Sequence, residues 1–329
     1  MASPRKTEVL QLLRDSKDYV SGQQICESFG ISRTAVWKII NQLKEEGYEI
    51  EAVQNKGYHL TGAPDVLSLS ELQSRMKTKM AGSHLLYFDV TGSTNVEAKK
   101  QAENGAPEGL LVVADKQEAG KGRRGRSWES PRGSGIFMTL MLKPDIRPDN
   151  ASMLTLVAAL AVAAAIRKCT GRPAGIKWPN DIVMNGKKVC GILTEMSAQV
   201  DYVNHVVIGI GINVHNESFP EEIAHMATSL YLETGEHQNR AVLIEEVWEQ
   251  FEHYYEIFLE TEDLSGLAKE YEAHLVNMHQ IVKVLDPKEP FEGKAMGITA
   301  RGELMVDTWE SRRLVSAGEV SVRGVYGYV

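Results

Sequence analysis

The segment AGKGRRGRSW, residues 119–128, contains the residues best suited to chemistry in this sequence. It sets four basic side chains among three glycines, in a chain whose formal net charge is -8. Glycines allow a loop to close tightly on a ligand, and desolvated Lys and Arg side chains form charge-assisted hydrogen bonds worth roughly 1.5 to 3 kcal/mol each. The segment suits a small anion such as a carboxylate or a phosphate, although by itself it is more typical of a solvated basic turn.

This loop differs from two common phosphate-binding motifs. The P-loop pattern GxxxxGK[ST] occurs nowhere in the chain. The hexapeptide GKGRRG at 120–125 matches GxGxxG, but its arginines stand where a Rossmann turn needs close approach of the backbone to the ligand. We therefore do not expect dinucleotide binding.

The composition limits where anions can bind. With 44 acidic and 36 basic residues, the net charge disfavours indiscriminate binding of nucleic acid, so anion sites must come from local clusters such as 121–126. A length of 329 residues with 43% hydrophobic content predicts two or three domains with a substantial core.

Cysteine usage and hydropathy predict the compartment. Cys26, Cys169 and Cys190 form no CxxC pair and no His/Cys zinc pattern, so we predict reduced thiols, a cytoplasmic protein and no metal site built from side chains. The longest apolar stretch, 153–166, is interpreted as a buried helix too short to cross a bilayer, and no membrane partner is expected.

The first sixty residues have the pattern of a winged helix-turn-helix. One helical pattern opens at Pro4, Ser21–Gln24 forms a capping box for a second, and Ser32 caps a third after a break at Gly30. The runs YEIEAV and YHLT flank a turn at 55–57 and predict a hairpin wing.

This unit is predicted to bind DNA, with its third helix in a major groove and its wing near a phosphate. Phosphate contacts alone give affinities of only about 10⁻⁴ to 10⁻⁶ M, so specific repression predicts a homodimer on two half-sites of operator DNA. A small protein-interaction domain is the alternative. The predicted DNA-binding residues are Ser32, Arg33, Thr34, Trp37, Lys38 and Lys56.

The central region is predicted to be a mixed α+β domain. The stretch 61–71, rich in Gly, Pro and small polar residues, predicts a linker, so we place the DNA-binding domain at 1–63 and the catalytic domain at 66–275. Helical patterns near 95–104 and 151–168 alternate with strand-like runs. The runs are LLYFDV, LLVVAD, IFMTLMLK, DIVM, KKVCGIL and HVVIGIGINV.

Two neighbouring lysines enter one of these strands. Asn185-Gly186 predicts a two-residue hairpin directly before Lys187 and Lys188. Adjacent strand residues point to opposite faces, so only one of the lysines can face a site, and the pattern does not decide which.

Five short motifs follow one another along this region. They are GSTN at 92–95, ADKQEAGKGRRGRSW at 114–128, IKWPND at 176–181, KKVCGIL at 187–193 and GIGINV at 209–214. Together they resemble the biotin protein ligases. With the winged-helix unit in front, the chain is similar over nearly its whole length to the bifunctional biotin operon repressors. Each motif is weak alone, and their order makes the resemblance specific.

The resemblance implies an ATP-dependent biotin protein ligase that also represses the genes of biotin synthesis. The carboxylate of biotin attacks the α-phosphorus of ATP, pyrophosphate leaves, and a lysine of a biotin carboxyl carrier protein then attacks the biotinyl-5′-adenylate. Like charges 4 Å apart repel by about 4 kcal/mol at an effective dielectric near 20, so cations must converge there. Arg123 is implied to bridge the carboxylate and the α-phosphate, and Lys188 to reach phosphate oxygens, with Mg²⁺ assisting. The adenylate is expected to promote dimerisation and DNA binding.

The family motifs also imply the ligand contacts. Ser93 and Thr94 have an alternative interpretation as helix caps, Trp128 as a core residue, and IGIGI as an ordinary buried strand. The family loop commonly has arginine where Lys121 stands. Lysine keeps the charge but lacks the bidentate hydrogen bonding of a guanidinium, which puts the role of Lys121 in doubt. The implied biotin-binding residues are Ser93, Thr94, Asn95, Gln117, Gly120, Lys121, Arg123 and Lys188. The implied ATP or adenylate contacts are Arg124, Trp128, Asn180 and Asn213.

The last part of the chain predicts a further domain. A helical stripe from Leu243 to Phe258 and a second helical run near 264–275 precede short strand-like runs between glycine and proline turns. These runs predict a small β-barrel at 276–329, which the family has as an SH3-like domain. It is expected to close one side of the active site, with peptide binding as the alternative. The predicted fold is thus α+β and multidomain, with a central mixed α/β domain like that of biotin and lipoate ligases.

Two other functions are compatible with parts of the sequence. A transcription factor that only senses a ligand would have the pocket without turnover. A lipoate ligase would share the fold and the adenylation chemistry, but GKGRRG and KWPND argue against it.

Overall fold

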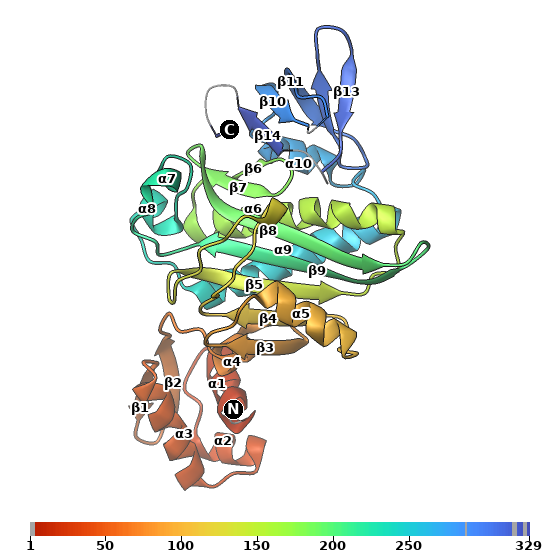
Figure 1. Ribbon diagram of the computed structural model, residues 1–329. Coiled ribbons are helices and arrows are strands. Elements are labelled where there is room, and N and C mark those ends of the chain that lie inside the picture. The colour runs from red at the N-terminus through yellow and green to blue at the C-terminus, as the bar shows by residue number, and fades with distance from the viewer. Residues whose placement is uncertain (1–3, 287, 318–320, 325–327) are drawn as a thin grey trace. The chain divides into compact units, whose positions relative to one another are not determined.

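The computed structural model describes residues 4–286, 288–317, 321–324 and 328–329 (Figure 1). The chain forms two compact units. The first comprises Met1–Lys77 with Asn239–Glu245, and the second comprises Thr78–Gln238 with Glu246–Val329.

The first unit is the predicted helix-turn-helix with a wing. Ser21 and Ser32 are the N-caps of its second and third helices, and their hydroxyls accept hydrogen bonds from Gln24 N and Ala35 N. Gly30, at φ 63°, ends the second helix in the left-handed conformation. Its elements are α1 (Pro4–Asp15), α2 (Gly22–Phe29), α3 (Arg33–Glu45), β1 (Glu49–Val53), β2 (Gly57–Gly62) and α4 (Leu69–Arg75).

The helix α4 lies partly in the stretch predicted as a linker. Its Glu71 is fully buried and accepts hydrogen bonds from Arg14 Nη2 at 2.7 Å, Tyr48 OH at 2.6 Å and Arg75 Nε at 2.5 Å. A buried carboxylate needs such partners, and these join α4 to the remainder of the first unit. The division between the units falls after Lys77, later than the predicted 63–66.

A seven-stranded sheet forms the centre of the second unit, in the order β3-β4-β5-β9-β8-β7-β6. Only β3 and β4 pair in parallel, and every other neighbouring pair in this sheet is antiparallel. The six predicted strands are confirmed, and the three-residue β6 was missed because it is too short for a periodic signal. The strands are β3 (His84–Phe88), β4 (Leu110–Ala114), β5 (Gly135–Leu142), β6 (Gly175–Lys177), β7 (Asp181–Met184), β8 (Lys187–Ala198) and β9 (Val203–Asn213).

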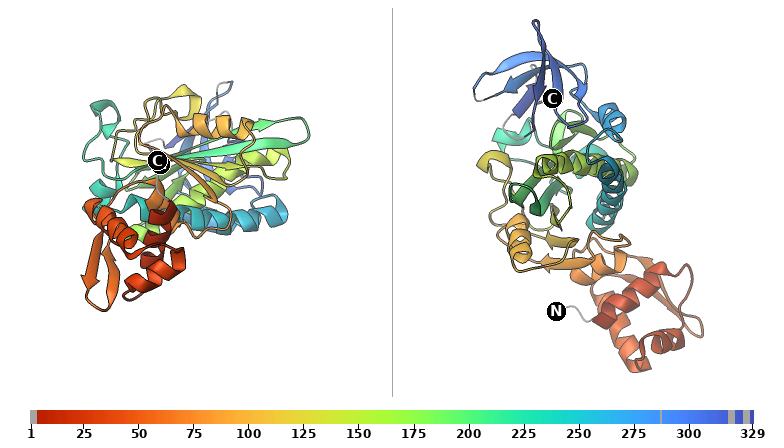
Figure 2. Two further views of the ribbon diagram at one scale, coloured as in Figure 1. Left: turned by 90° about the horizontal axis from the view of Figure 1, so that it is seen from below. Right: turned by 90° about the vertical axis from the view of Figure 1, so that its right-hand side faces the viewer.

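Two helices cover opposite faces of this sheet, α5 (Thr94–Glu103) and α6 (Leu154–Thr170) (Figure 2). Two adjacent residues of β8 show the two faces, because neighbouring strand residues point to opposite sides. Glu195 accepts a hydrogen bond from Asn95 of α5, and Thr194 accepts one from Thr155 of α6. With the preceding 3-10 turn η2 (Pro148–Met153), α6 forms a 23-residue helix that is long and apolar enough to cross a membrane. The length argument against a membrane span was therefore wrong. The predicted burial is confirmed, because 78% of the apolar window is buried inside the protein.

The remaining elements follow the sheet in the chain. The predicted stripe of α9 is buried, with Leu243, Val247, Phe251 and Phe258 each at 0% exposure. The C-terminal strands form a five-stranded antiparallel sheet in the order β13-β12-β11-β10-β14. The helices are α7 (Glu221–Ala224), α8 (Leu230–Thr234), α9 (Arg240–Thr261) and α10 (Ala268–His274). The strands are β10 (Ile281–Leu285), β11 (Phe291–Ile298), β12 (Leu304–Asp307), β13 (Arg312–Val315) and β14 (Ser321–Gly324).

Candidate active site

Glycines on one face of β8 and β9 make room for a pocket. Trp128 lies against this face, and a Cβ added at Gly211 would come 2.6 Å from its Nε1. A Cβ at Gly191 would come 3.1 Å from the same indole. The alternating glycines therefore admit a large ring where ordinary strand residues would fill the space.

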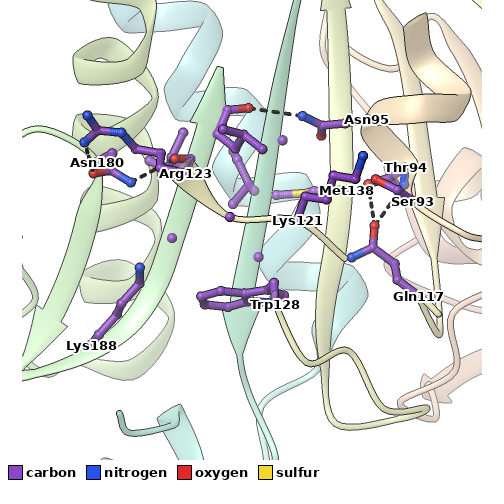
Figure 3. Close-up of a pocket in the computed structure, with 17 residues that line it drawn as sticks. Ser93, Thr94, Asn95, Gln117, Lys121, Arg123, Trp128, Met138, Asn180 and Lys188 are labelled. Atoms are coloured by element: carbon purple, nitrogen blue, oxygen red, sulfur yellow. Dashed lines mark hydrogen bonds between the residues drawn. The ribbon is translucent and has the colours of Figure 1, made fainter. Parts of the chain in front are cut away.

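A group of polar side chains lines one end of a cavity of about 50 Å³. Gln117 Oε1 accepts hydrogen bonds from Thr94 N at 2.8 Å and from Thr94 Oγ1 at 3.1 Å (Figure 3). Gln117 Nε2 donates to Ser130 Oγ at 3.0 Å. Ser93 occupies the N-cap position of α5, but among the described residues its hydroxyl makes no capping bond. Ser93 therefore caps α5 by position but not through its side chain. Ser93, Thr94, Asn95 and Gln117 all line the cavity.

Arg123 lies where three cavities meet. It is part of the short turn η1 (Arg123–Gly125), and its Nη1 donates to Asn180 Oδ1 at 2.9 Å (Figure 3). Its Nη2 donates to Ala317 O at 2.5 Å. Asn180 is held in turn by its Nδ2, which donates to Ile192 O at 3.0 Å. Both Arg123 and Asn180 line the cavity of about 50 Å³ and two neighbours of about 350 and 270 Å³. Burial lowers the pKa of Arg123 below its ordinary value.

Of the two adjacent lysines, Lys188 faces the pocket. Its Nζ lies 2.6 Å from Asp181 Oδ1 and 5.3 Å from the centroid of the Trp128 ring (Figure 3). Lys187 is exposed and its Nζ lies 3.4 Å from Ala224 O. The structure thereby decides the choice that the strand pattern left open.

Sequence reasoning missed a second lysine. Lys177, in the IKWPND motif, is 4% exposed, and its Nζ lies 3.2 Å from the ring centroid of Tyr328. Burial, opposed by Asp181 and reinforced by nearby cations, lowers its pKa to about 8. It lines the cavity of about 270 Å³ together with Arg126 and Arg323. The motif contained the signal for Lys177, but no local pattern connects it to Arg323 and Tyr328, which come from the end of the chain.

Other predicted site residues have different surroundings. Gly120 packs closely, since a Cβ there would lie 2.4 Å from Trp128 O. Lys121 is exposed and lines the cavity of about 50 Å³, whereas Arg124 is exposed and lines the cavity of about 350 Å³. Asn213 is 7% exposed, and its Nδ2 donates to Thr228 O at 3.0 Å. The structure therefore brings most of the predicted residues together, whereas Gly120, Arg124 and Asn213 do not line the cavity of about 50 Å³.

The predicted DNA-binding residues lie on exposed positions of α3 and the wing. The Trp37 side chain is 58% exposed, and Arg33 Nη2 donates to Gln23 Oε1 at 3.1 Å. Lys56 Nζ lies 5.6 Å from the ring centroid of Tyr19, and a cavity of about 440 Å³ is lined by Arg33 and Lys56. Ser32, Thr34 and Lys38 are exposed as well.

Within the described part of the chain, no group of three or more His, Cys, Asp or Glu residues is placed to hold a metal ion. Asp181 is the carboxylate beside the pocket lysines; it forms an ion pair with Lys188 and accepts a hydrogen bond from the hydroxyl of Tyr328.

Comparisons with known proteins match each part of the chain. Family models match at residues 87–213 (Biotin/lipoate A/B protein ligase family), 5–59 (HTH domain) and 280–323 (Biotin protein ligase C terminal domain). The chain is similar to the bifunctional ligase/repressor BirA of Bacillus subtilis, with 42% identity over 325 residues that cover 98% of this chain and 100% of the relative. The BirA of Escherichia coli is 27% identical over 306 residues, covering 93% and 94% of the two chains.

A solved structure agrees with these matches. The biotin protein ligase from Aquifex aeolicus in complex with biotin and ATP superposes with a TM-score of 0.65 and 30% identity, covering 74% of this chain and 99% of that one.

Proposed function

The chain belongs to the family of the bifunctional ligase/repressors, and from this we propose that it is an ATP-dependent biotin protein ligase that also represses transcription. The observation that carries the ligase assignment is the place of Arg123 between a polar pocket and a cationic cavity. A carboxylate from one side and a phosphate from the other meet at this guanidinium.

The polar pocket suits the ring of biotin. A ureido group offers two N–H donors and a carbonyl acceptor, which require polar partners once they are desolvated. Ser93, Thr94, Asn95 and Gln117 supply such partners at the N-terminus of α5 and on the adjoining loop. Gly120 and Lys121 then close the loop over the pocket.

The cationic cavity suits the phosphates. The carboxylate oxygen of biotin attacks the α-phosphorus, the bond to the bridging oxygen breaks, and pyrophosphate leaves with the electron pair. Repulsion of about 4 kcal/mol for each pair of like charges opposes this approach, at 4 Å and an effective dielectric near 20. Arg123 bridges the carboxylate and the α-phosphate, while Lys188, Lys177 and Arg126 stabilise phosphate oxygens.

The second step transfers biotin to an acceptor. The amine of a lysine on a biotin carboxyl carrier protein attacks the carbonyl carbon of the mixed anhydride, AMP leaves, and an amide forms after loss of a proton. The adenylate must be retained until the acceptor arrives. We assign Trp128, Arg124 and Asn213 to the nucleotide, and Asn180 to the orientation of Arg123.

Mg²⁺ is expected to neutralise phosphate charge, because it usually binds through substrate phosphates and one or two carboxylates. Asp181, beside Lys188 and Lys177, is the carboxylate that fits this arrangement. We assign the protein to the cytoplasm, where its acceptor, ATP and operator are found.

The ligase assignment is tested by mixing the purified protein with Mg-ATP and biotin without an acceptor. We expect biotinyl-5′-adenylate and pyrophosphate, detected by mass analysis. Binding of biotin without either product would favour a ligand-sensing transcription factor. A competition between biotin and lipoate in the same assay tests the related lipoate ligase activity, and preferential turnover of lipoate would contradict the assignment.

The exposed residues of α3 and the wing support repression through DNA. We propose that the adenylate promotes a homodimer that binds two operator half-sites. Selection from a random-sequence DNA pool, with biotin and ATP present, is expected to enrich a palindromic site. Lys38→Ala is expected to lower the salt dependence of binding to that site by about one phosphate contact. Unchanged DNA affinity after deletion of residues 1–62 would refute this part of the proposal.

A further inference from the structure

Two residues of opposite charge face each other across the strands β6 and β7. Lys177 and Asp181 are direct partners in the antiparallel register of these strands, so their side chains point to the same face of the sheet (Figure 1). Residues at such positions have Cβ atoms about 4.5 to 5.5 Å apart, which lets an ammonium reach a carboxylate. The sheet geometry therefore favours a cross-strand ion pair.

The structure shows a different arrangement. Lys177 is 4% exposed, yet within the described part of the chain no carboxylate forms an ion pair with it. Asp181 Oδ1 lies 2.6 Å from Lys188 Nζ, and Asp181 Oδ2 accepts a hydrogen bond from the hydroxyl of Tyr328. Both carboxylate oxygens thus have other partners, and the charge of Lys177 is not neutralised beside the cavity of about 270 Å³.

Tyr328 accounts for this difference through two contacts. Its hydroxyl donates to Asp181 Oδ2, and the centroid of its ring lies 3.2 Å from Lys177 Nζ. Burial and the neighbouring Asp181 raise the pKa of the Tyr328 hydroxyl above its ordinary value, so the group remains a donor. The face of the ring attracts the ammonium without removing its charge. The hydroxyl occupies the oxygen that would otherwise be available to Lys177.

A lysine that binds phosphate needs an available charge. An ion pair between Lys177 and Asp181 would have to break each time an anion binds in the cavity. Without that pair, the ammonium joins Arg123 and Arg126 among the cations that line the cavity. Because the pKa of Lys177 is about 8, the group is still mostly charged at neutral pH.

We propose that Tyr328 is a positioning residue that keeps Asp181 from pairing with Lys177, so that the ammonium stays available to a bound polyphosphate. The inference rests on the proposed function, which assigns this cavity to phosphates. It adds to that function a residue 147 positions after Asp181. Tyr328 acts through Asp181 and Lys177 and needs no contact with the reacting atoms.

A double-mutant cycle separates this role from a merely structural one. Tyr328→Phe removes the hydroxyl, keeps the ring over Lys177 and frees Asp181 Oδ2. Asp181→Asn removes the charge that could pair with the ammonium. The dissociation constant of inorganic pyrophosphate is measured by calorimetry near pH 7, without a divalent metal, for the wild type, both single variants and the double variant. Tyr254→Phe is the matched control, because the Tyr254 hydroxyl also donates to a carboxylate, that of Glu270.

We expect Tyr328→Phe to weaken pyrophosphate binding about tenfold, since one charge-assisted hydrogen bond to a phosphate oxygen is lost. In the Asp181→Asn background the same change should cost less than about twofold, because no carboxylate remains to pair with Lys177. Tyr254→Phe should leave the affinity unchanged. In the assay with Mg-ATP and biotin, Tyr328→Phe should raise KM for ATP and leave KM for biotin unchanged.

Equal losses of affinity in both backgrounds, or no loss in Tyr328→Phe, would overturn the inference. If Asp181→Asn does not fold, Lys177→Gln takes its place in the cycle, and a loss on adding Tyr328→Phe to that variant would overturn the inference as well. A wild type that binds no pyrophosphate would overturn it even if biotinyl-5′-adenylate forms. A wild type that binds pyrophosphate and shows the expected cycle, but forms no adenylate, would refute the ligase function and support the role of Tyr328.

Discussion

Replacement of Arg123 by glycine is expected to release the reactive adenylate from the protein. The guanidinium connects three segments, because it bonds to Asn180 Oδ1 and to Ala317 O from its own loop. Its side chain also lies at the junction of the polar pocket and the cationic cavity, where we place the acyl-phosphate linkage. Glycine removes both the anchors of the loop and the charge beside this linkage.

The magnitude follows from the bonds that are lost. A hydrogen bond to a charged group contributes about 1.5 to 3 kcal/mol, and about 1.4 kcal/mol corresponds to a factor of ten. Loss of one such bond to the adenylate raises its dissociation rate about 10- to 150-fold. The assay forms labelled biotinyl-5′-adenylate on the protein, adds an excess of unlabelled adenylate, and follows release by rapid filtration. Released adenylate should also biotinylate lysines of a bystander protein such as serum albumin.

Arg124→Gly is the matched comparison, since it removes the same charge and adds the same flexibility one position later. Arg124 is exposed and has a left-handed conformation at φ 58°, which glycine adopts without strain. Arg124 is also assigned to the nucleotide, but an exposed charge contact is worth only about 0.2 to 1 kcal/mol, so we expect release from this variant to be about fivefold faster at most. Equal acceleration in both variants would show that loop flexibility controls release, and unchanged release from Arg123→Gly would refute the bridging role of Arg123.

The other predictions concern packing, protonation and stability. Gly211→Ala puts a Cβ 2.6 Å from Trp128 Nε1, so the indole must move, and adenylate formation should fall roughly tenfold in a pyrophosphate-release assay. The pKa of Lys177 lies at about 8, so its charge, and any activity that depends on it, is lost as pH rises through 8. Phosphate binding favours the charged form of Lys177, so pyrophosphate binding near pH 8.5 should be accompanied by proton uptake, and binding near pH 6.5 should not. Calorimetry in buffers of different ionisation enthalpy measures this uptake. Lys177→Gln should abolish it. Glu71→Ala leaves Arg14 buried without its carboxylate and should destabilise the first unit by about 3 kcal/mol. The measurement is hydrogen exchange, which should be faster throughout residues 4–77. Exchange as slow as in the wild type would contradict this prediction.

Local signals in the sequence were sufficient for the main elements. Ser21 and Ser32 cap helices because a hydroxyl at that position satisfies a free N–H, which requires only neighbouring residues. The Asn185-Gly186 turn and the alternating glycines of β9 are equally local. They predicted the hairpin before Lys188 and a buried, closely packed strand, whereas the packing of Trp128 on that strand came from the structure.

Non-local contacts account for what the sequence did not predict. α4 is short, and its place in the first unit depends on Glu71 meeting Arg14 from a helix 57 positions away. The turn at Arg123 is held by Ala317, 194 positions later. No periodicity or spacing links such residues, so the resemblance to a family identified Arg123 while its partners came only from the structure.

The charge distribution around Lys177 explains why one cavity suits polyphosphate. Burial is the main cause of the lowered pKa of this ammonium; Asp181 opposes it with a negative charge, and Lys188, Arg323 and Arg126 add to it. Cations held this close repel one another, so the empty site stores an unfavourable energy that an anion relieves. Between pH 8 and 10.5 the unfolded lysine binds more protons than the folded one, so burial, together with the nearby cations, makes the protein more stable as pH rises through that interval. Pyrophosphate should reverse this trend, because a bound anion keeps Lys177 charged. The stabilisation of the protein by bound pyrophosphate is then largest near neutral pH, where all four cations are available to the departing phosphates.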